Sequence, residues 1–307
     1  MTECLYRLYE DQKKHFRTGD PHPAGREALV HLARGKCISP AGLLCFVALR
    51  YYPLSEQTDG GNTMRKLYEK NELTFALGWI AIYVAGTSLA EMLSETIGAY
   101  KLVPAAFHIV LTACLFLWVM RNGLAEKYGL FLPRYRLLRV WLFIPLMLVC
   151  VYKIVFSPAL RFSAAESILF VISMLCVGFL EEIIFRGFLF RAIAKENLTR
   201  AVIISSITFG IGHIVNLLTG QNLLDTIGQI IFAVFAGFAL VVLFHKGKSL
   251  VPCIVFHSVF NALSVVSNDE ALYRALGGPA LTTVIMIAVS AVVLGGYSVW
   301  NWKHLEG

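Results

Sequence analysis

Two adjacent glutamates and an arginine lie inside an otherwise apolar stretch of the sequence. The segment Gly178–Gly187 reads GFLEEIIFRG. On an α-helix, Glu182 and Arg186 share a face and can form an ion pair, whereas Glu181 lies about 100° away around the axis. We therefore interpret Glu182 as structural and Glu181 as the carboxylate that is available for chemistry. The alternative is that both glutamates only mark the end of a helix near the membrane surface.

Two further apolar stretches each contain a histidine at helical spacing from a second side chain. The first reads FGIGH, from Phe209 to His213, and the second reads HSVFN, from His257 to Asn261. A histidine and an amide on one helix face can donate hydrogen bonds toward a common point, as stabilisation of an oxyanion requires. The two glycines before His213 permit close approach of a neighbouring backbone or a substrate. Either pair alone could instead be a buried polar contact that joins helices in lipid.

Depth in the membrane connects the three stretches. Ionisable groups at membrane depth cost at least about 2.5–3.5 kcal/mol each, which makes them candidates for function. At about 1.5 Å per residue from the nearest basic loop residues, Glu181, His213 and His257 lie roughly 15, 20 and 14 Å deep. These groups can meet in one layer, where a carboxylate can act as a general base. Zinc is the alternative occupant, because His and carboxylate ligands suit it. His108, in another apolar stretch, is expected to pack or to hydrogen bond between helices.

The composition indicates the class of protein in which these residues sit. Of 307 residues, 57% are hydrophobic and 15% are charged, and the mean hydropathy is +0.66. Apolar runs of about twenty residues match the thickness of a bilayer. We predict an all-α polytopic membrane protein with an intramembrane polar site and about eight transmembrane helices, near 73–92, 102–120, 137–156, 166–190, 201–219, 224–244, 249–267 and 279–302.

The basic residues indicate orientation rather than nucleic-acid binding. The net charge is +7, but Lys and Arg cluster at the ends of the apolar runs and form no basic stripe. Their excess alternates from loop to loop, and the positive-inside rule then places both termini in the cytoplasm. Residues 1–63 are more polar, so we predict an N-terminal cytoplasmic extension, 1–63, and a membrane domain, 64–307. The seven cysteines are scattered and indicate no disulfide framework.

The ordered motifs EExxxR, FxxxH and HxxxN resemble those of the CPBP family of intramembrane proteases. This family includes the type II CaaX prenyl endopeptidases and bacterial bacteriocin-processing and immunity proteins, and the resemblance covers roughly residues 64–307. It implies an eight-helix, glutamate-type endopeptidase without a metal cofactor. Carried onto this chain, it implies that Glu181 and His213 activate water and that His257 and Asn261 form the oxyanion hole. The supporting residues would be Glu182, Arg186 and Phe209.

The expected function is hydrolysis of peptide bonds within the bilayer. The expected partners are membrane lipid and a peptide or protein substrate, prenylated or otherwise processed, and no nucleic acid. The motifs of other intramembrane proteases, HExxH and GxGD, do not occur in the sequence. The alternative is a catalytically silent immunity, scaffold or binding protein of the same fold.

Overall fold

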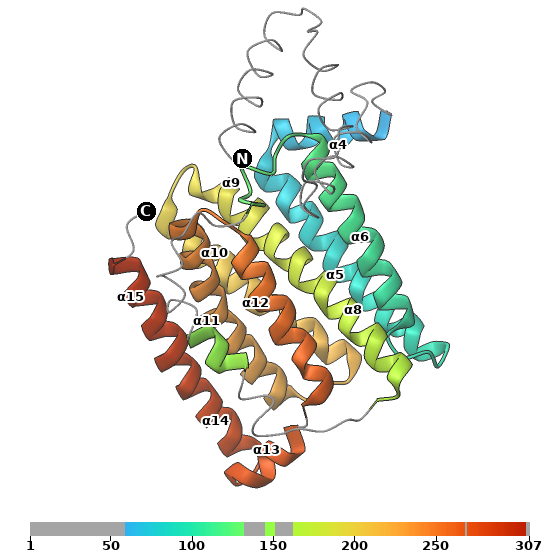
Figure 1. The fold of residues 1–307 in the computed structure, drawn as a ribbon, viewed down its shortest axis with the longest axis vertical. Helices are drawn as coiled ribbons and strands as arrows, with labels where there is room; N and C mark the ends of the chain where they lie inside the picture. The colour runs from blue at the N-terminus through green and yellow to red at the C-terminus, as the bar shows by residue number, and fades with distance from the viewer. Residues whose placement is uncertain (1–58, 132–144, 151–161, 268, 305–307) are drawn as a thin grey trace, which may run out of the picture. The chain divides into compact units, whose positions relative to one another are not determined.

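The structure, a computed structural model, describes residues 59–131, 145–150, 162–267 and 269–304, and these ranges are predominantly helical (Figure 1). The described helical elements are α4 (Asp59–Lys70), α5 (Glu72–Thr96), α6 (Leu102–Arg121), α8 (Ala164–Glu181), η2 (Glu182–Phe190), α9 (Arg191–Ala194), α10 (Leu198–Ile211), η3 (Gly212–Thr219), α11 (Leu223–Gly247), α12 (Val251–Ala262), η4 (Leu263–Val266), α13 (Asp269–Leu276), α14 (Pro279–Ser290), η5 (Ala291–Gly295) and α15 (Gly296–His304).

Six helical stretches are long and apolar enough to cross a membrane, and they confirm six of the predicted spans. They are Glu72–Thr96, Leu102–Arg121, Ala164–Ala194, Leu198–Thr219, Leu223–Gly247 and Pro279–His304. The predicted span 249–267 corresponds to the shorter apolar helix Val251–Val266. The predicted span 137–156 lies mostly outside the described residues. The chain is therefore an integral, multi-pass membrane protein.

Local sequence explains where four of the spans begin. A side-chain oxygen at the first position accepts a hydrogen bond from a backbone N–H three residues later, which satisfies a donor that the helix leaves free. Ser163 and Glu166 complete a reciprocal capping box at the start of α8. The other three caps are Asn71, Asn197 and Asn222.

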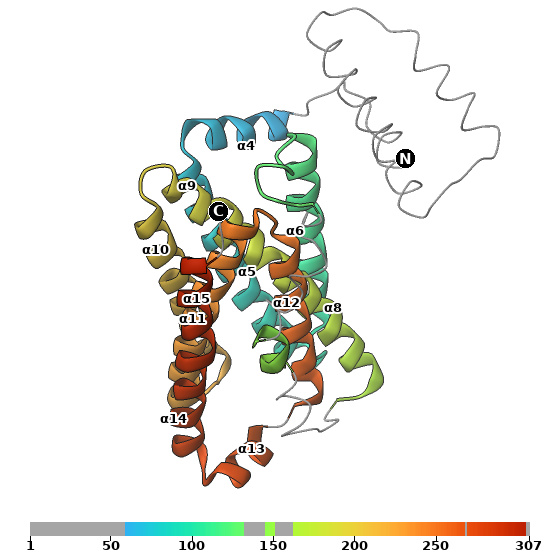
Figure 2. The ribbon, with the colours of Figure 1, turned by 60° about the vertical axis from the view of Figure 1, so that its left-hand side comes forward.

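The long helices run side by side, and α8 lies between α6 and α12 (Figure 1). Figure 2 shows α11, α14 and α15 on one side of the bundle and α6, α8 and α12 on the other.

Two glycines permit close approaches between neighbouring long helices. A Cβ atom at Gly178 would lie 2.6 Å from the backbone nitrogen of Ser258 on α12, and one at Gly210 would lie 2.8 Å from the carbonyl oxygen of Ile230 on α11. The Gly210 contact is the close backbone approach expected at that position.

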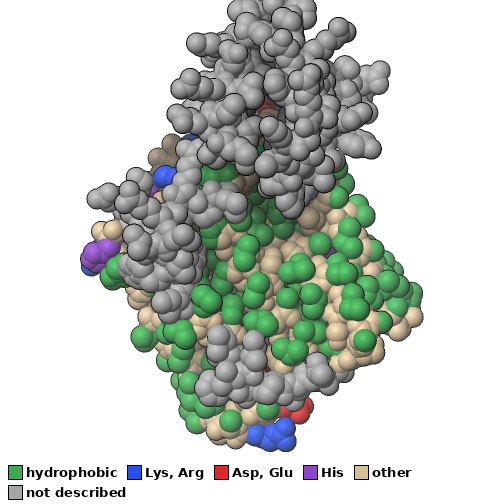
Figure 3. Space-filling view, in the orientation of Figure 1, with side chains coloured by type: hydrophobic (Ala, Val, Ile, Leu, Met, Phe, Trp, Pro, Cys, Tyr) green, Lys and Arg blue, Asp and Glu red, His purple; other side chains and the backbone are tan. Residues whose placement is uncertain are grey.

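The outer surface is apolar, as contact with lipid requires. Hydrophobic side chains cover the face shown in Figure 3, and the charged side chains visible there lie toward its ends. Large apolar residues such as Val110 and Leu218 are exposed on the described helices. Soluble proteins rarely expose so many large apolar side chains together, so this surface agrees with a membrane-embedded bundle.

The predicted boundary between residues 63 and 64 falls within a helix. Helix α4 begins at Asp59 and continues through Met64 to Lys70. Met64 packs against the hydrophobic core of the bundle. The remainder of the predicted extension, residues 1–58, lies outside the described residues.

Candidate active site

Glu181 and Glu182 lie where the α-helix of α8 changes into the π-helix η2. Every residue of η2 is buried, and π-helical turns within α-helices occur frequently at functional sites. The exposed fraction is 9% for Glu181 and 0% for Glu182. Both carboxylates therefore lie inside the helical bundle.

His257 on α12 lies between the two carboxylates. Its Nδ1 is 2.7 Å from Oε1 of Glu182, and its Nε2 is 3.2 Å from Oε2 of Glu181. The Tyr83 hydroxyl of α5 donates a 2.7 Å hydrogen bond to the other oxygen of Glu181. Glu181 therefore has partners other than Arg186. Its partners come from α5 and α12, and the spacing of residues within one helix cannot reveal them.

Arg186 forms the ion pair with Glu182 that the spacing predicts, with Nη1 3.1 Å from Oε1. Its guanidinium carbon lies 4.0 Å from the centre of the Phe209 ring, so the buried cation also rests on an aromatic face.

Phe209 is the aromatic centre of the site. Its ring contacts Phe185, His213 and His257 edge-on, at centroid distances of 5.3, 5.4 and 5.6 Å. The Phe209 side chain is 4% exposed, so it excludes water from one side of the ion pair between Glu182 and Arg186. The FxxxH motif thus positions Arg186 and both histidines around one ring.

His213 belongs to the short 3₁₀ segment η3, which continues α10. Its Nδ1 lies 3.3 Å from the carbonyl oxygen of Phe209, and donation of a hydrogen bond to that oxygen assigns the proton to Nδ1. Its Nε2 is then a proton acceptor. No direct hydrogen bond joins His213 to Glu181 in the described structure, although the two residues line the same cavity.

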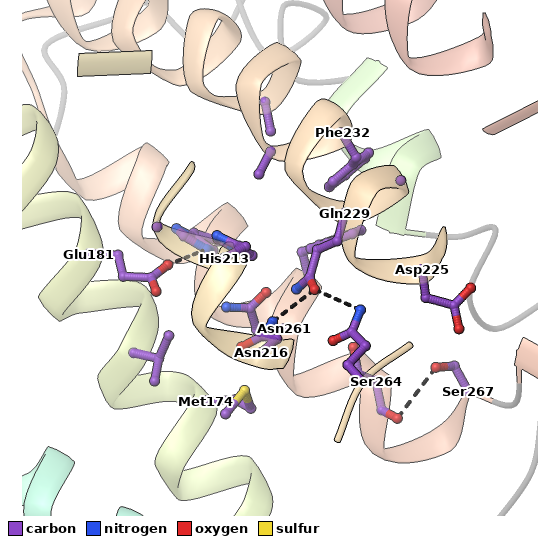
Figure 4. A pocket seen from close by; sticks show the side chains of 18 of the residues that line it. Met174, Glu181, His213, Asn216, Asp225, Gln229, Phe232, Asn261, Ser264 and Ser267 are labelled. Atoms are coloured by element: carbon purple, nitrogen blue, oxygen red, sulfur yellow. Dashed lines mark hydrogen bonds and ion pairs between the residues drawn. The ribbon is translucent and has the colours of Figure 1, made fainter. Parts of the chain in front are cut away.

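All four residues with implied catalytic roles line one cavity of about 660 Å³. Figure 4 shows Glu181 on one side of this cavity, with Asn261, Asn216 and Gln229 grouped away from it. The Asn261 side chain lines the cavity without a hydrogen bond to another described residue. Toward the α13 end of the bundle the lining continues to Lys101, Asp269 and Tyr273.

Sequence reasoning missed Tyr83. The chain contains 12 tyrosines. Tyr83 lies in an apolar stretch, and no spacing in the sequence relates it to Glu181. His108 is a buried interhelical contact, as expected: Nε2 lies 3.0 Å from Oγ1 of Thr87 and Nδ1 lies 2.9 Å from Oγ of Ser173. It joins α5, α6 and α8 beside the same cavity.

The zinc alternative requires several ligand side chains close together. Among the described residues, no group of three or more His, Cys, Asp and Glu side chains is placed to hold a metal ion. The two ring nitrogens of His257 are directed at Glu182 and Glu181, and Nδ1 of His213 faces its own helix.

Residues 163–263 match the model of a protein family, described as type II CAAX prenyl endopeptidase Rce1-like. The matched region begins at the cap of α8 and ends just after α12, so it contains all three motifs. No curated protein and no solved structure matches the chain.

Proposed function

We propose that this chain, as a member of the Rce1-like family of type II CAAX prenyl endopeptidases, hydrolyses peptide bonds with a water molecule that Glu181 and His213 activate. The family is one of proteases, and the chain is accordingly a CAAX-type intramembrane peptidase. The mechanism and the substrate are the proposal. The observation that carries it is the convergence of Glu181, His213, His257 and Asn261 on one cavity among the apolar helices.

The attacking group is water rather than a side chain. The water oxygen bonds to the carbonyl carbon of the scissile peptide, while Glu181 and Nε2 of His213 accept the proton that the water loses. The C–N bond then breaks, and the same proton passes to the leaving amine. The tautomer of His213 supports this role, because its Nδ1 is engaged by the Phe209 carbonyl and its Nε2 is an acceptor.

His257 and Asn261 stabilise the oxyanion. The Nε2 of His257 lies 3.2 Å from Glu181. This contact is longer than the 2.7 Å contact between Nδ1 of the same ring and Glu182. This N–H can therefore turn toward negative charge on the substrate oxygen. The Asn261 amide, four residues further along α12, donates toward the same cavity.

Glu182, Arg186 and Phe209 act as supporting residues. Glu182 accepts at Nδ1 of His257 and so orients the ring whose other nitrogen faces Glu181. Arg186 compensates the charge of Glu182, and Phe209 covers Arg186. These residues position the catalytic groups and do not contact the reacting bond.

The substrate is a peptide with an apolar or lipidated segment. Phe232 and Phe260 stack at 5.2 Å, and Phe256 stacks on Phe260 at 5.9 Å; all three line the cavity. This aromatic wall, on α11 and α12, suits an apolar chain next to the bond that is cut. A prenylated peptide meets this requirement.

A reconstituted assay with a farnesylated CAAX peptide tests the mechanism. Glu181→Gln keeps the side-chain volume but removes the base, so kcat should fall by about 10²–10⁴. Asn261→Ala removes one oxyanion donor and should lower kcat by about 10²–10³. Glu196→Gln, at an exposed carboxylate in the loop after α9, is the matched control and should cleave normally.

Two outcomes would reject the mechanism. Normal cleavage by a folded Glu181→Gln protein would mean that another group is the base. Loss of activity with a chelator and recovery with zinc would mean that the metal-free mechanism is wrong. If the wild-type protein cleaves no CAAX peptide, comparison of membrane peptides from cells with and without the chain, by mass spectrometry, decides between another substrate and a catalytically silent binding protein.

A further inference from the structure

Three primary amides meet in the cavity beside the candidate catalytic groups. The Oε1 of Gln229 on α11 accepts a 2.8 Å hydrogen bond from Nδ2 of Asn216 and a 3.0 Å hydrogen bond from Nε2 of Gln221. Asn216 lies one 3₁₀ turn after His213 on η3, and Gln221 lies in the turn between η3 and α11. All three residues line the cavity, and Figure 4 shows Asn216 beside Gln229.

This arrangement fixes how the Gln229 amide is presented. Because two N–H donors converge on a single oxygen, the carboxamide cannot rotate without losing both hydrogen bonds. Its Nε2 group, which carries two N–H donors, has no hydrogen-bond partner among the described residues. An amide donor held in a fixed direction within a largely apolar cavity gains most from an acceptor that the ligand brings.

The charges around the cavity indicate which acceptor this is. The amide cluster of Asn216, Gln221 and Gln229 is neutral. The lysine at the cavity, Lys101, already contacts Glu91, and Asp225 accepts from Tyr273. A carboxylate or phosphate would be left without a cation, whereas a neutral carbonyl oxygen needs only an N–H donor.

We propose that the amide cluster is a subsite for the peptide backbone, in which Nε2 of Gln229 donates to a main-chain carbonyl oxygen of the substrate flanking the scissile bond. This inference rests on the proposed protease function and adds a residue that binds substrate without taking part in the chemical step. Gln229 aligns the extended chain along α11, between the aromatic wall and His213. Because a backbone carbonyl is present in every peptide, the subsite sets the register of the substrate rather than its side-chain preference.

Gln229→Met tests the subsite, because it removes the amide while it keeps a side chain of similar length. With the farnesylated CAAX peptide, KM should rise about three- to tenfold, the effect of one neutral hydrogen bond, and kcat should stay within about twofold. Gln229→Glu retains an oxygen for Asn216 and Gln221 but replaces the donor, and it should raise KM as well. Glu196→Gln, at an exposed carboxylate outside the cavity lining, should leave both constants unchanged.

A substrate series identifies the carbonyl. Peptides in which one flanking peptide bond at a time is replaced by an ester carry a weaker carbonyl acceptor at that position. One ester should raise KM for the wild-type protein and have no further effect in Gln229→Met. Additive effects at every position, or a Gln229→Met protein that loses kcat with an unchanged KM, would overturn the proposal.

The subsite can also be tested without turnover. Equilibrium binding of a fluorescent version of the same peptide to Glu181→Gln, and to Glu181→Gln combined with Gln229→Met, should show the same three- to tenfold difference in Kd. Failure of the wild-type protein to cleave, with this difference present, would reject the proposed mechanism and keep the subsite. Equal binding by both proteins would reject the subsite whatever the activity.

Discussion

His257 shows how a buried site of ionisable residues is held together. One ring nitrogen faces Glu182, the other faces Glu181, and Arg186 completes the set. Each group would be costly to bury alone, since an unpaired charge in low dielectric costs several kcal/mol. These groups therefore stabilise one another in the buried site, and removal of one leaves the others buried without a charged partner.

Glu182→Gln should lower stability more than Glu181→Gln does. Glu182 is fully buried and is the acidic partner of both Arg186 and His257, so a neutral amide there leaves the guanidinium uncompensated. We expect a loss of about 3 kcal/mol, typical of a buried pair that loses one partner. Thermal unfolding of the detergent-solubilised variants measures it. Equal melting temperatures for the two variants would contradict the structural role of Glu182.

Tyr83→Phe should reduce turnover through Glu181. The substitution removes the hydroxyl that donates to Oε1 of Glu181 and keeps the buried ring. A hydrogen bond to a charged group is worth about 1.5–3 kcal/mol, so we expect kcat to fall about tenfold or more with little change in KM. The matched control is Tyr128→Phe, at a buried tyrosine whose hydroxyl bonds to Tyr68 instead. Similar kcat values in the two variants would show that Tyr83 does not position Glu181.

At the scale of the elements, the approach of α8 to α12 determines whether the site forms. Gly178 lies directly against Ser258, the residue after His257, and the Ser258 hydroxyl donates to the Leu175 carbonyl. The π-helix η2 then begins at Glu182 and presents both glutamates to His257. A change in the distance between these two helices is therefore a change in the contacts of the site.

Gly178→Ala should separate α8 from α12. The added Cβ would lie 2.2 Å from Oγ, 2.6 Å from the backbone nitrogen and 2.7 Å from Cα of Ser258. Such overpacking costs about 1–3 kcal/mol and moves His257 away from the glutamates. We expect lower thermal stability together with at least a tenfold loss of kcat.

Two further variants make the Gly178 test specific. Gly78→Ala on α5 adds the same atom where nothing lies within 4 Å, so it should have no effect on activity. Gly178→Ala combined with Ser258→Gly should stay impaired, because two of the three nearest atoms belong to the backbone. Full recovery in that double variant would mean that the added Cβ atom clashes only with the Ser258 hydroxyl and not with the backbone of α12.

At the scale of the whole molecule, the loops rich in lysine and arginine gather at one end. Lys127, after α6, and Lys195, after α9, lie 2.6 and 2.8 Å from the same oxygen of Glu72 at the start of α5. The Leu250 N–H, after α11, donates to the Gly129 carbonyl at the same end. The cavity lining extends toward the opposite end, which carries α13.

Cysteine labelling should place this basic end in the cytoplasm. The positive-inside rule favours that side for loops rich in Lys and Arg. In a cysteine-free background, single cysteines at Lys127 and Lys195 should react with a membrane-impermeant reagent only after the cells are permeabilised. A cysteine at Asn222, in the turn after η3, is the control and should react in intact cells. Labelling of Lys127 or Lys195 from outside would overturn the orientation.

The sequence by itself determined the membrane class and most of the spans, and it predicted the residues to which catalytic roles are assigned. Apolar runs and ionisable side chains within them are properties of the chain order, because burial in lipid requires a helix and makes each charge costly. The pair of Glu182 with Arg186 was also predictable, since both residues belong to one helix.

Only the tertiary structure decided which partners those residues have. Tyr83, Glu181 and His257 come from three helices, and no spacing in the sequence relates them. The same holds for the amide cluster, where Gln229 meets Asn216 and Gln221 across a turn. Helix periodicity specifies which residues share a face, but the rotation and approach of neighbouring helices, set here by Gly178 and Gly210, specify which faces meet.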